Sequence, residues 1–127
     1  MSVVQAFKHA VSANPAKTAA ICGSTRLTFS DLEERVNRFS ACLTALGIEK
    51  NDRVAVLSLN CHRYFELYYA IPQAGAVIVP INFRIPAREV KYILDHSESV
   101  AIAVDATMRP IIDEIRGELR TMDLSFA

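Results

Sequence analysis

Residues 53–105 read RVAVLSLNCHRYFELYYAIPQAGAVIVPINFRIPAREVKYILDHSESVAIAVD, and this stretch decides the fold. It holds three short apolar runs, at 53–59, 76–81 and 100–104, and each has the length of a buried strand. Two helix-like segments separate these runs. Strands that alternate with helices in this way are typical of a parallel sheet with crossover helices. The stretch therefore predicts an α/β fold with a β-α-β-α-β core.

The helix between the first two runs is expected from about Cys61 to Ala74, with Asn60 as its cap. Its apolar residues cover a wide arc, which predicts burial on more than one side. The next strand contains Pro80, which has no N–H to donate, so this strand is expected to end or to lie exposed there. Pro86 suits the first turn of the following helix.

Outward toward the amino terminus, residues 3–13 predict a short amphipathic helix. TAAIC and TRLTF then flank Gly23-Ser24, and a two-residue turn that opens with glycine predicts a type II′ hairpin.

The clearest helix is expected to begin at Ser30, because Ser30 and Glu33 match the Ser-x-x-Glu capping box. An apolar stripe follows at spacings of four and three: Leu32, Val36, Phe39, Leu43 and Leu46. Gly47 suits the left-handed position that ends such a helix, with Ile48 folded back onto its last turn.

Outward toward the carboxyl terminus, Asp105 is expected to cap the end of the strand at 100–104. A fourth helix is expected at about 107–120, with one apolar face. The residues after it show no pattern, and no element is predicted there.

The composition excludes several classes of protein. Fourteen basic and fourteen acidic side chains cancel, so no net field would attract nucleic acid or an anionic membrane. The apolar fraction of 51% argues against disorder. No apolar run approaches the ~20 residues that span a bilayer, and residues 1–11 lack the pattern of a signal peptide.

Three cysteines, Cys22, Cys42 and Cys61, have no CxxC spacing. We interpret them as buried thiols in a reducing compartment and not as a disulfide framework. A cytoplasmic location is therefore expected.

The residues predict no catalytic group and no metal ligand. No two of the four glycines lie closer than 24 positions, so the chain has no phosphate loop and no GxGxxG fingerprint. His9, His62 and His96 are scattered, with no HExxH. A GxSxG nucleophile motif is also absent from the sequence.

Residues 14–105 nevertheless resemble the N-terminal part of the adenylate-forming acyl-CoA synthetases. Six signatures occur in the order of that family: Thr28-Phe29-x-Asp31-Leu32, Leu46-Gly47-Ile48, Asp52-Arg53-Val54-Ala55, Ala74-Gly75-Ala76-Val77, Pro80-Ile81-Asn82-x-Arg84 and Tyr92-Ile93-Leu94. The joint match is specific, whereas any one signature would be weak.

The resemblance implies an acid–CoA ligase that uses ATP, Mg²⁺ and coenzyme A, with a carboxylic acid, of the fatty-acid type, as its substrate. In that family the phosphate loop, the acid pocket and the catalytic lysine follow the matched region. We therefore expect residues 1–127 to be a single partial domain, an incomplete portion of the family's N-terminal domain, with the C-terminal domain absent. Alone, it is expected to be inactive and to bind none of these cofactors.

The resemblance also places the loop after the second strand and the turn after the third near the nucleotide end of coenzyme A. Here these are Asn82-Phe83-Arg84 and Arg109, and arginine suits phosphate through its fork of donors. The alternative is that Asn82 caps a turn and that both arginines are ordinary surface residues.

Two other interpretations of the whole chain remain open at this point. It could be a free-standing α/β interaction module on the same scaffold, or part of a peptide-synthetase adenylation domain. As a fragment on its own, the chain has an incomplete sheet that would leave a strand edge and an apolar face uncovered, which predicts self-association.

Overall fold

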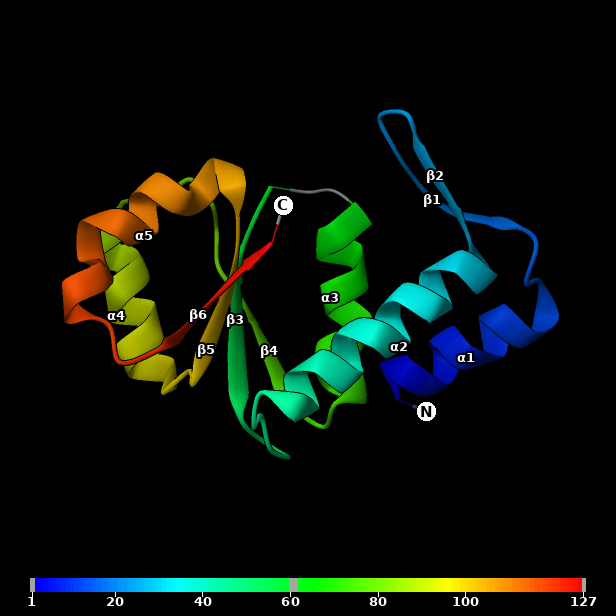
Figure 1. The fold of residues 1–127 in the computed structure, drawn as a ribbon, viewed down its shortest axis with the longest axis horizontal. Coiled ribbons are helices and arrows are strands. Elements are labelled where there is room, and N and C mark those ends of the chain that lie inside the picture. The colour runs from blue at the N-terminus through cyan, green and yellow to red at the C-terminus, as the bar shows by residue number, and fades with distance from the viewer. Residues whose placement is uncertain (1, 60–61, 127) are drawn as a thin grey trace. The chain divides into compact units, whose positions relative to one another are not determined.

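The computed structural model describes residues 2–59 and 62–126. They form two compact units. The first unit comprises Met1–Lys50 and Asn60–Gly75, and the second comprises Asn51–Leu59 and Ala76–Ala127. Figure 1 shows the helices and strands of both units.

The second unit contains a four-stranded parallel sheet in the order β4-β3-β5-β6. Its strands are β3 (Arg53–Leu57), β4 (Val77–Pro80), β5 (Ala101–Asp105) and β6 (Met122–Phe126). Its helices are α4 (Ala87–Ser97) and α5 (Arg109–Ile115), the latter flanked by short 3-10 turns η1 (Ala106–Met108) and η2 (Arg116–Glu118). The predicted β-α-β-α-β order and the α/β class are confirmed.

The prediction that nothing follows the last helix was wrong. Residues 122–126 form β6, which pairs with β5 along its whole length. The segment MDLSF alternates apolar and polar residues, but five residues give too short an alternation to distinguish from chance. The helix predicted at 107–120 is also shorter, because η1 and η2 replace its two ends.

One face of this sheet carries the core of the second unit. Alternate residues of β3 and β5 point to the same side, so Ala55 lies beside Ile102 and Leu57 beside Val104. Val90 and Leu94 of α4 and Ile112 and Ile115 of α5 pack against them, and both helices lie on this face (Figure 1). Pro80 is exposed and ends edge strand β4, as its missing donor predicts.

The first unit contains α1 (Val3–Ala13), the hairpin β1 (Thr18–Cys22) and β2 (Thr25–Thr28), α2 (Phe29–Ala45) and α3 (His62–Gln73). The hairpin is antiparallel, and Gly23 has a φ of +58°. A positive φ at the first turn residue alone fits the predicted type II′ turn. Phe7, Val11, Leu27, Val36 and Ala70 are among the residues of its core.

The predicted start of α2 was wrong. Thr28, and not Ser30, is the N-cap: its hydroxyl accepts from the Asp31 N–H at 3.0 Å, and the Asp31 carboxylate accepts from the Thr28 N–H at 3.0 Å. Two overlapping capping boxes exist in Thr-Phe-Ser-Asp-Leu-Glu. The chain uses the earlier one because β2 delivers Thr28 with the extended backbone that an N-cap requires.

The Thr28→Ala variant should lose about 1 kcal/mol of unfolding free energy, because the Asp31 N–H in the first turn of α2 loses the side-chain hydroxyl that caps it. Ser30→Ala is the matched control and should stay within about 0.5 kcal/mol of the parent chain. Urea denaturation followed by circular dichroism measures both variants. A larger loss of unfolding free energy for Ser30→Ala than for Thr28→Ala would show that Ser30 is the N-cap, as the sequence predicted.

The end of α2 follows the prediction at Gly47 and departs from it at Leu46. Gly47 has a φ of +94°, and the Ile48 N–H donates to the Leu43 carbonyl at 3.1 Å, which is the Schellman pattern. Leu46, however, lies beyond the helix and is 44% exposed. Ser40 takes the buried place within the apolar stripe.

Helix α3 packs against both α1 and α2 within the first unit, in agreement with the wide apolar arc of its sequence. Phe65 and Tyr68 are exposed, whereas Glu66, Leu67, Ala70 and Ile71 are buried. The Tyr69 ring contacts three other aromatic rings: it stacks on Phe7 and meets Phe65 and Tyr68 edge-on. The proposed cap, Asn60, and Cys61 lie outside the described residues.

The interpretation of the cysteines as buried thiols was wrong for two of the three. Cys42 is exposed and Cys22 is half-buried, and both are free thiols. Cys42 falls off the buried stripe of α2, because it lies beside Leu43 at an angle of about 100° around the helix. Within residues 2–59 and 62–126, every helix is too short or too polar to cross a membrane.

Candidate functional site

The carboxyl ends of the parallel strands form the edge at which open α/β sheets bind their ligands. In the second unit three segments leave the sheet there. Ser58 and Leu59 follow β3, residues 81–85 follow β4, and residues 106–109 follow Asp105, the last residue of β5. We call this set of segments the carboxyl edge.

Asp105 ties two of these segments together. Its Oδ2 accepts hydrogen bonds from the Ser58 hydroxyl at 2.8 Å and from the Leu59 N–H at 2.9 Å. Its Oδ1 accepts from the Met108 N–H at 2.9 Å, as the N-cap of η1. The prediction that Asp105 caps the strand end is confirmed, but the link to β3 could not be foreseen, because register is not readable from one strand.

The environment of Asp105 favours its charged form. Burial opposes ionisation, but the hydrogen bonds from Leu59, Ser58, Met108 and Thr107 outweigh it, and the pKa of the carboxyl lies below its usual range. The carboxylate is therefore ionised at neutral pH, and each of its hydrogen bonds is charge-assisted.

This lowered pKa sets the sign of a pH effect. A depressed pKa in the folded chain stabilises the fold above the unfolded-state pKa, about 4, and that contribution disappears as the pH falls through the folded value. Melting temperatures recorded between pH 7 and pH 2.5 should therefore fall less steeply below pH 4 for Asp105→Asn than for the parent chain. Identical curves would contradict this expectation.

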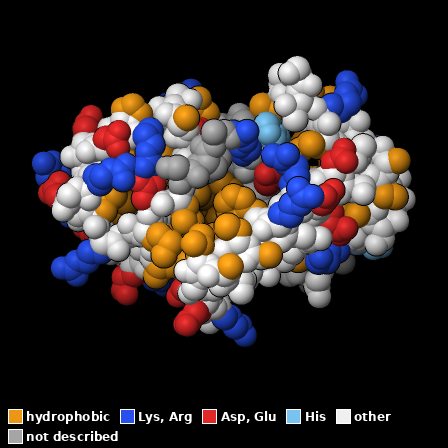
Figure 2. All heavy atoms as spheres, viewed as in Figure 1, with side chains coloured by type: hydrophobic (Ala, Val, Ile, Leu, Met, Phe, Trp, Pro, Cys, Tyr) orange, Lys and Arg blue, Asp and Glu red, His pale blue; other side chains and the backbone are white. Residues whose placement is uncertain are grey.

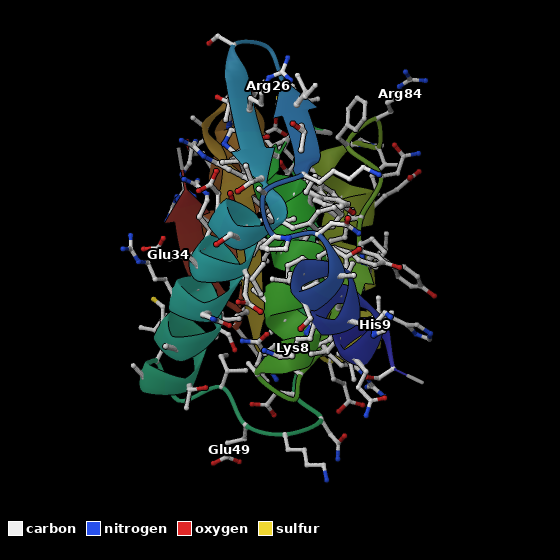
Figure 3. All side chains as sticks on the ribbon, turned by 90° about the vertical axis from the view of Figure 1, so that its right-hand side faces the viewer. Lys8, His9, Arg26, Glu34, Glu49 and Arg84 are labelled. Carbon is white, nitrogen blue, oxygen red and sulfur yellow. The ribbon has the colours of Figure 1, made fainter. Side chains whose placement is uncertain are left out.

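The loop after β4 is built around Asn82. Its side-chain Oδ1 accepts from the Arg84 N–H at 2.9 Å, which closes a tight turn. The Arg84 guanidinium lies 5.3 Å from the centre of the Phe83 ring, a cation–π contact, and is exposed. The side chain extends outward from the loop (Figure 3). Asn82 thus caps a turn, and Arg84 keeps its donors available to solvent.

Arg109 is arranged differently, because its guanidinium is held by protein. Its two terminal nitrogens form a forked ion pair with the two carboxylate oxygens of Asp123 on β6. Arg116 also reaches Asp123, at 2.9 Å, and bonds Asp113 at 2.8 Å. The structure thus gives these two predicted site residues separate partners.

Opposite charges are interspersed in this way over the face seen in Figure 2, where no large patch of one sign appears. In the part of the chain that the structure describes, no three acidic, histidine or cysteine side chains gather to hold a metal ion.

The first unit holds a second polar cluster that sequence reasoning missed. Glu66 of α3 is 5% exposed and pairs with Arg35 of α2. These two residues line a shallow hollow with Arg38, Phe39 and Cys42. Burial lowers the pKa of the nearby His62, while Glu66 opposes that shift. A lone glutamate in the middle of an apolar helix was the available signal for this cluster.

Comparison with known proteins gives a consistent result. The profile of the family described as "AMP-binding enzyme" matches residues 7–125. A long-chain-fatty-acid–CoA ligase of Thermus thermophilus is 39% identical over 97 residues, which are 76% of this chain and 18% of that protein. The ligase FadD13 of Mycobacterium tuberculosis is 43% identical over 93 residues, 73% of this chain and 18% of that protein.

A solved structure titled as a fatty acyl CoA synthetase of Mycobacterium tuberculosis superimposes with a TM-score of 0.91. It is 34% identical and aligns with 97% of this chain and 26% of its own length. The chain thus spans about a fifth of the length of the curated relatives it matches. These matches do not favour the free-standing interaction module.

Proposed function

Because the chain belongs to the AMP-binding enzyme family, we propose that its residues work within an ATP-dependent acid–CoA ligase. The observation that carries this proposal is the match of the family profile to residues 7–125, nearly the whole chain. The named ligases among the relatives support a fatty acid as the substrate of the whole protein. A cytoplasmic location is part of the same proposal and rests on composition alone.

In such a ligase a carboxylate attacks the α-phosphate of ATP, which gives an acyl-adenylate and pyrophosphate. The thiol of coenzyme A then displaces AMP. A metal ion and cationic side chains stabilise the charge on the transferring phosphoryl group. The described residues contain no metal-ligand cluster, and the sequence has no glycine-rich phosphate loop, so we assign none of them to the adenylation step.

The carboxyl edge is the part of this chain that suits the second substrate. The exposed guanidinium of Arg84, fixed beside the Phe83 ring, can meet a phosphate of the coenzyme A nucleotide. Arg109 can meet a phosphate only if its guanidinium shares its donors between the phosphate and Asp123, or if it releases Asp123. Arg84 is therefore the stronger of the two candidates on geometry.

The test uses the complete protein that contains these residues, supplied with a long-chain fatty acid, ATP, Mg²⁺ and coenzyme A. Acyl-CoA should form, and Arg84→Ala should raise the KM for coenzyme A while ATP–pyrophosphate exchange continues unchanged. The 127-residue chain alone should give no thioester and no heat of binding with ATP in calorimetry. Absence of acyl-CoA from the complete protein with every acid tested would refute the proposed activity.

We also propose that the 127-residue chain associates with itself. Both edge strands carry exposed apolar side chains, Val77 on β4 and Met122 on β6, at 45% and 41% exposure. Edge strands with exposed apolar side chains and unpaired backbone groups pair readily with one another. Light scattering at micromolar concentration should give a mass above 14.1 kDa, and Met122→Lys with Val77→Lys should reduce it. A monodisperse monomer would overturn this proposal.

A further inference from the structure

One carboxylate at the carboxyl edge does more than a helix cap requires. An N-cap needs a single acceptor for an N–H of the first turn, and Asp105 supplies it to Met108 through Oδ1. The second oxygen, Oδ2, is used for β3, where it accepts from the Leu59 N–H and the Ser58 hydroxyl. Ser58 is 1% exposed, so this contact lies inside the fold.

We propose that Asp105 is a positioning residue for the coenzyme A step, because it locks the end of β3 to the turn that presents Arg109. This inference rests on the proposed function, in which the carboxyl edge faces the coenzyme A nucleotide. Asp105 itself needs no contact with substrate.

The geometry fixes Arg109 at both of its ends. Its backbone follows Met108 directly, and the Met108 N–H is bonded to Asp105. Its guanidinium is held by the fork to Asp123 on β6. An arginine restrained in this way loses little side-chain entropy when an anion arrives and shares the guanidinium with Asp123. Loss of Asp105 should free the backbone end and leave the fork in place.

The same carboxylate sets the end of β3 relative to that of β5. β3 and β5 are neighbours in the sheet, and the Leu59 N–H lies beyond the last ladder pair, Leu57 with Val104. The hydrogen bond from the Leu59 N–H to the Asp105 carboxylate therefore continues the pairing of β3 with β5 beyond the last backbone pair, at the carboxyl edge. Ser58 is buried, whereas Asp105 and Leu59 are half-buried.

The test compares Asp105→Asn with Asp95→Asn in the complete protein. Asparagine keeps the size of the side chain but replaces one acceptor oxygen with a donor, which faces the N–H groups unfavourably. Asp95 lies on α4 and pairs with Lys91, so its substitution removes the same charge away from this edge. The expected result for Asp105→Asn is a roughly tenfold rise in the KM for coenzyme A, with ATP–pyrophosphate exchange within about twofold of the parent.

Three outcomes separate the possibilities. Equal losses in the adenylation and thioester steps would show a purely structural role and overturn the inference, as would an unchanged KM for coenzyme A. If Arg84→Ala and Arg109→Ala both leave that KM unchanged, the proposed function of the edge fails instead. Ser58→Ala, which removes one donor and keeps the charge, provides a milder variant should Asp105→Asn not fold, and a rise of about twofold to threefold is expected.

A second readout needs only the 127-residue chain. In its nitrogen-15 spectra the Leu59 and Met108 amide protons should shift together as Asp105 is protonated in acid, and both shifts should vanish in Asp105→Asn. Independent behaviour of these two amides would show that no single carboxylate joins them and would overturn the inference on structural grounds.

Discussion

The Ile102→Ala variant should lose about 3 kcal/mol of unfolding free energy. Ile102 lies in β5, between two neighbouring strands, and is fully buried. Its side chain belongs to the cluster that joins the sheet to α4 and α5, so its removal leaves a cavity that these helices cannot easily fill. Truncations of this kind cost roughly 2–5 kcal/mol in well-packed cores.

This loss is large relative to the roughly 5–15 kcal/mol that holds a typical domain folded. Ile21→Ala is the matched control, because the same atoms are removed from a side chain that is 61% exposed. It should change stability by less than about 1 kcal/mol. Chemical denaturation of both variants gives the comparison, and equal losses would show that the second unit has no tightly packed core.

The second large effect concerns the ion pair between Arg35 and Glu66, whose two members are unequally exposed. The Arg35 side chain is 41% exposed, whereas that of Glu66 is 7% exposed. Arg35→Met should therefore cost about 2–3 kcal/mol, because it leaves a buried carboxylate without its partner. Glu66→Leu should cost less than about 1 kcal/mol, since the freed arginine can turn into water.

The double variant Arg35→Met with Glu66→Leu completes the thermodynamic cycle. It should recover most of the stability lost by Arg35→Met alone, because no buried charge then remains unpaired. Arg38→Met is the control, as Arg38 forms an exposed pair with Glu34 within the same helix and should change little. Equal costs for Arg35→Met and Glu66→Leu would contradict the asymmetric burial.

The sequence predicted elements that have a strong period or a sharp boundary. The alternation of apolar runs and helical segments in residues 53–105 predicted three of the four strands of the parallel sheet, and Gly47 marked the correct end of α2. Prediction from the sequence failed where two local signals competed. Thr28 and Ser30 both head a plausible capping box, and only the path of β2 decides between them.

The contacts of the candidate site residues could not be predicted from the sequence, and their role in binding stays a prediction. Asn82 and Arg84 were found through the resemblance, and the structure adds the Asx turn and the cation–π contact that fix them. The partner of Arg109 could not be foreseen, because Asp123 lies in the strand that showed no usable pattern. Glu66 was missed for a related reason, since its burial depends on the packing of α2 against α3.

The strand order has a consequence for how the second unit is made on the ribosome. β3 is synthesised first, yet one of its two neighbours, β5, is encoded far downstream, and Val54 pairs with Ala101. Closing so long a segment delays folding more than it weakens the final structure. β4 can pair with one side of β3 soon after both are translated, whereas the other side of β3 stays open until β5 follows.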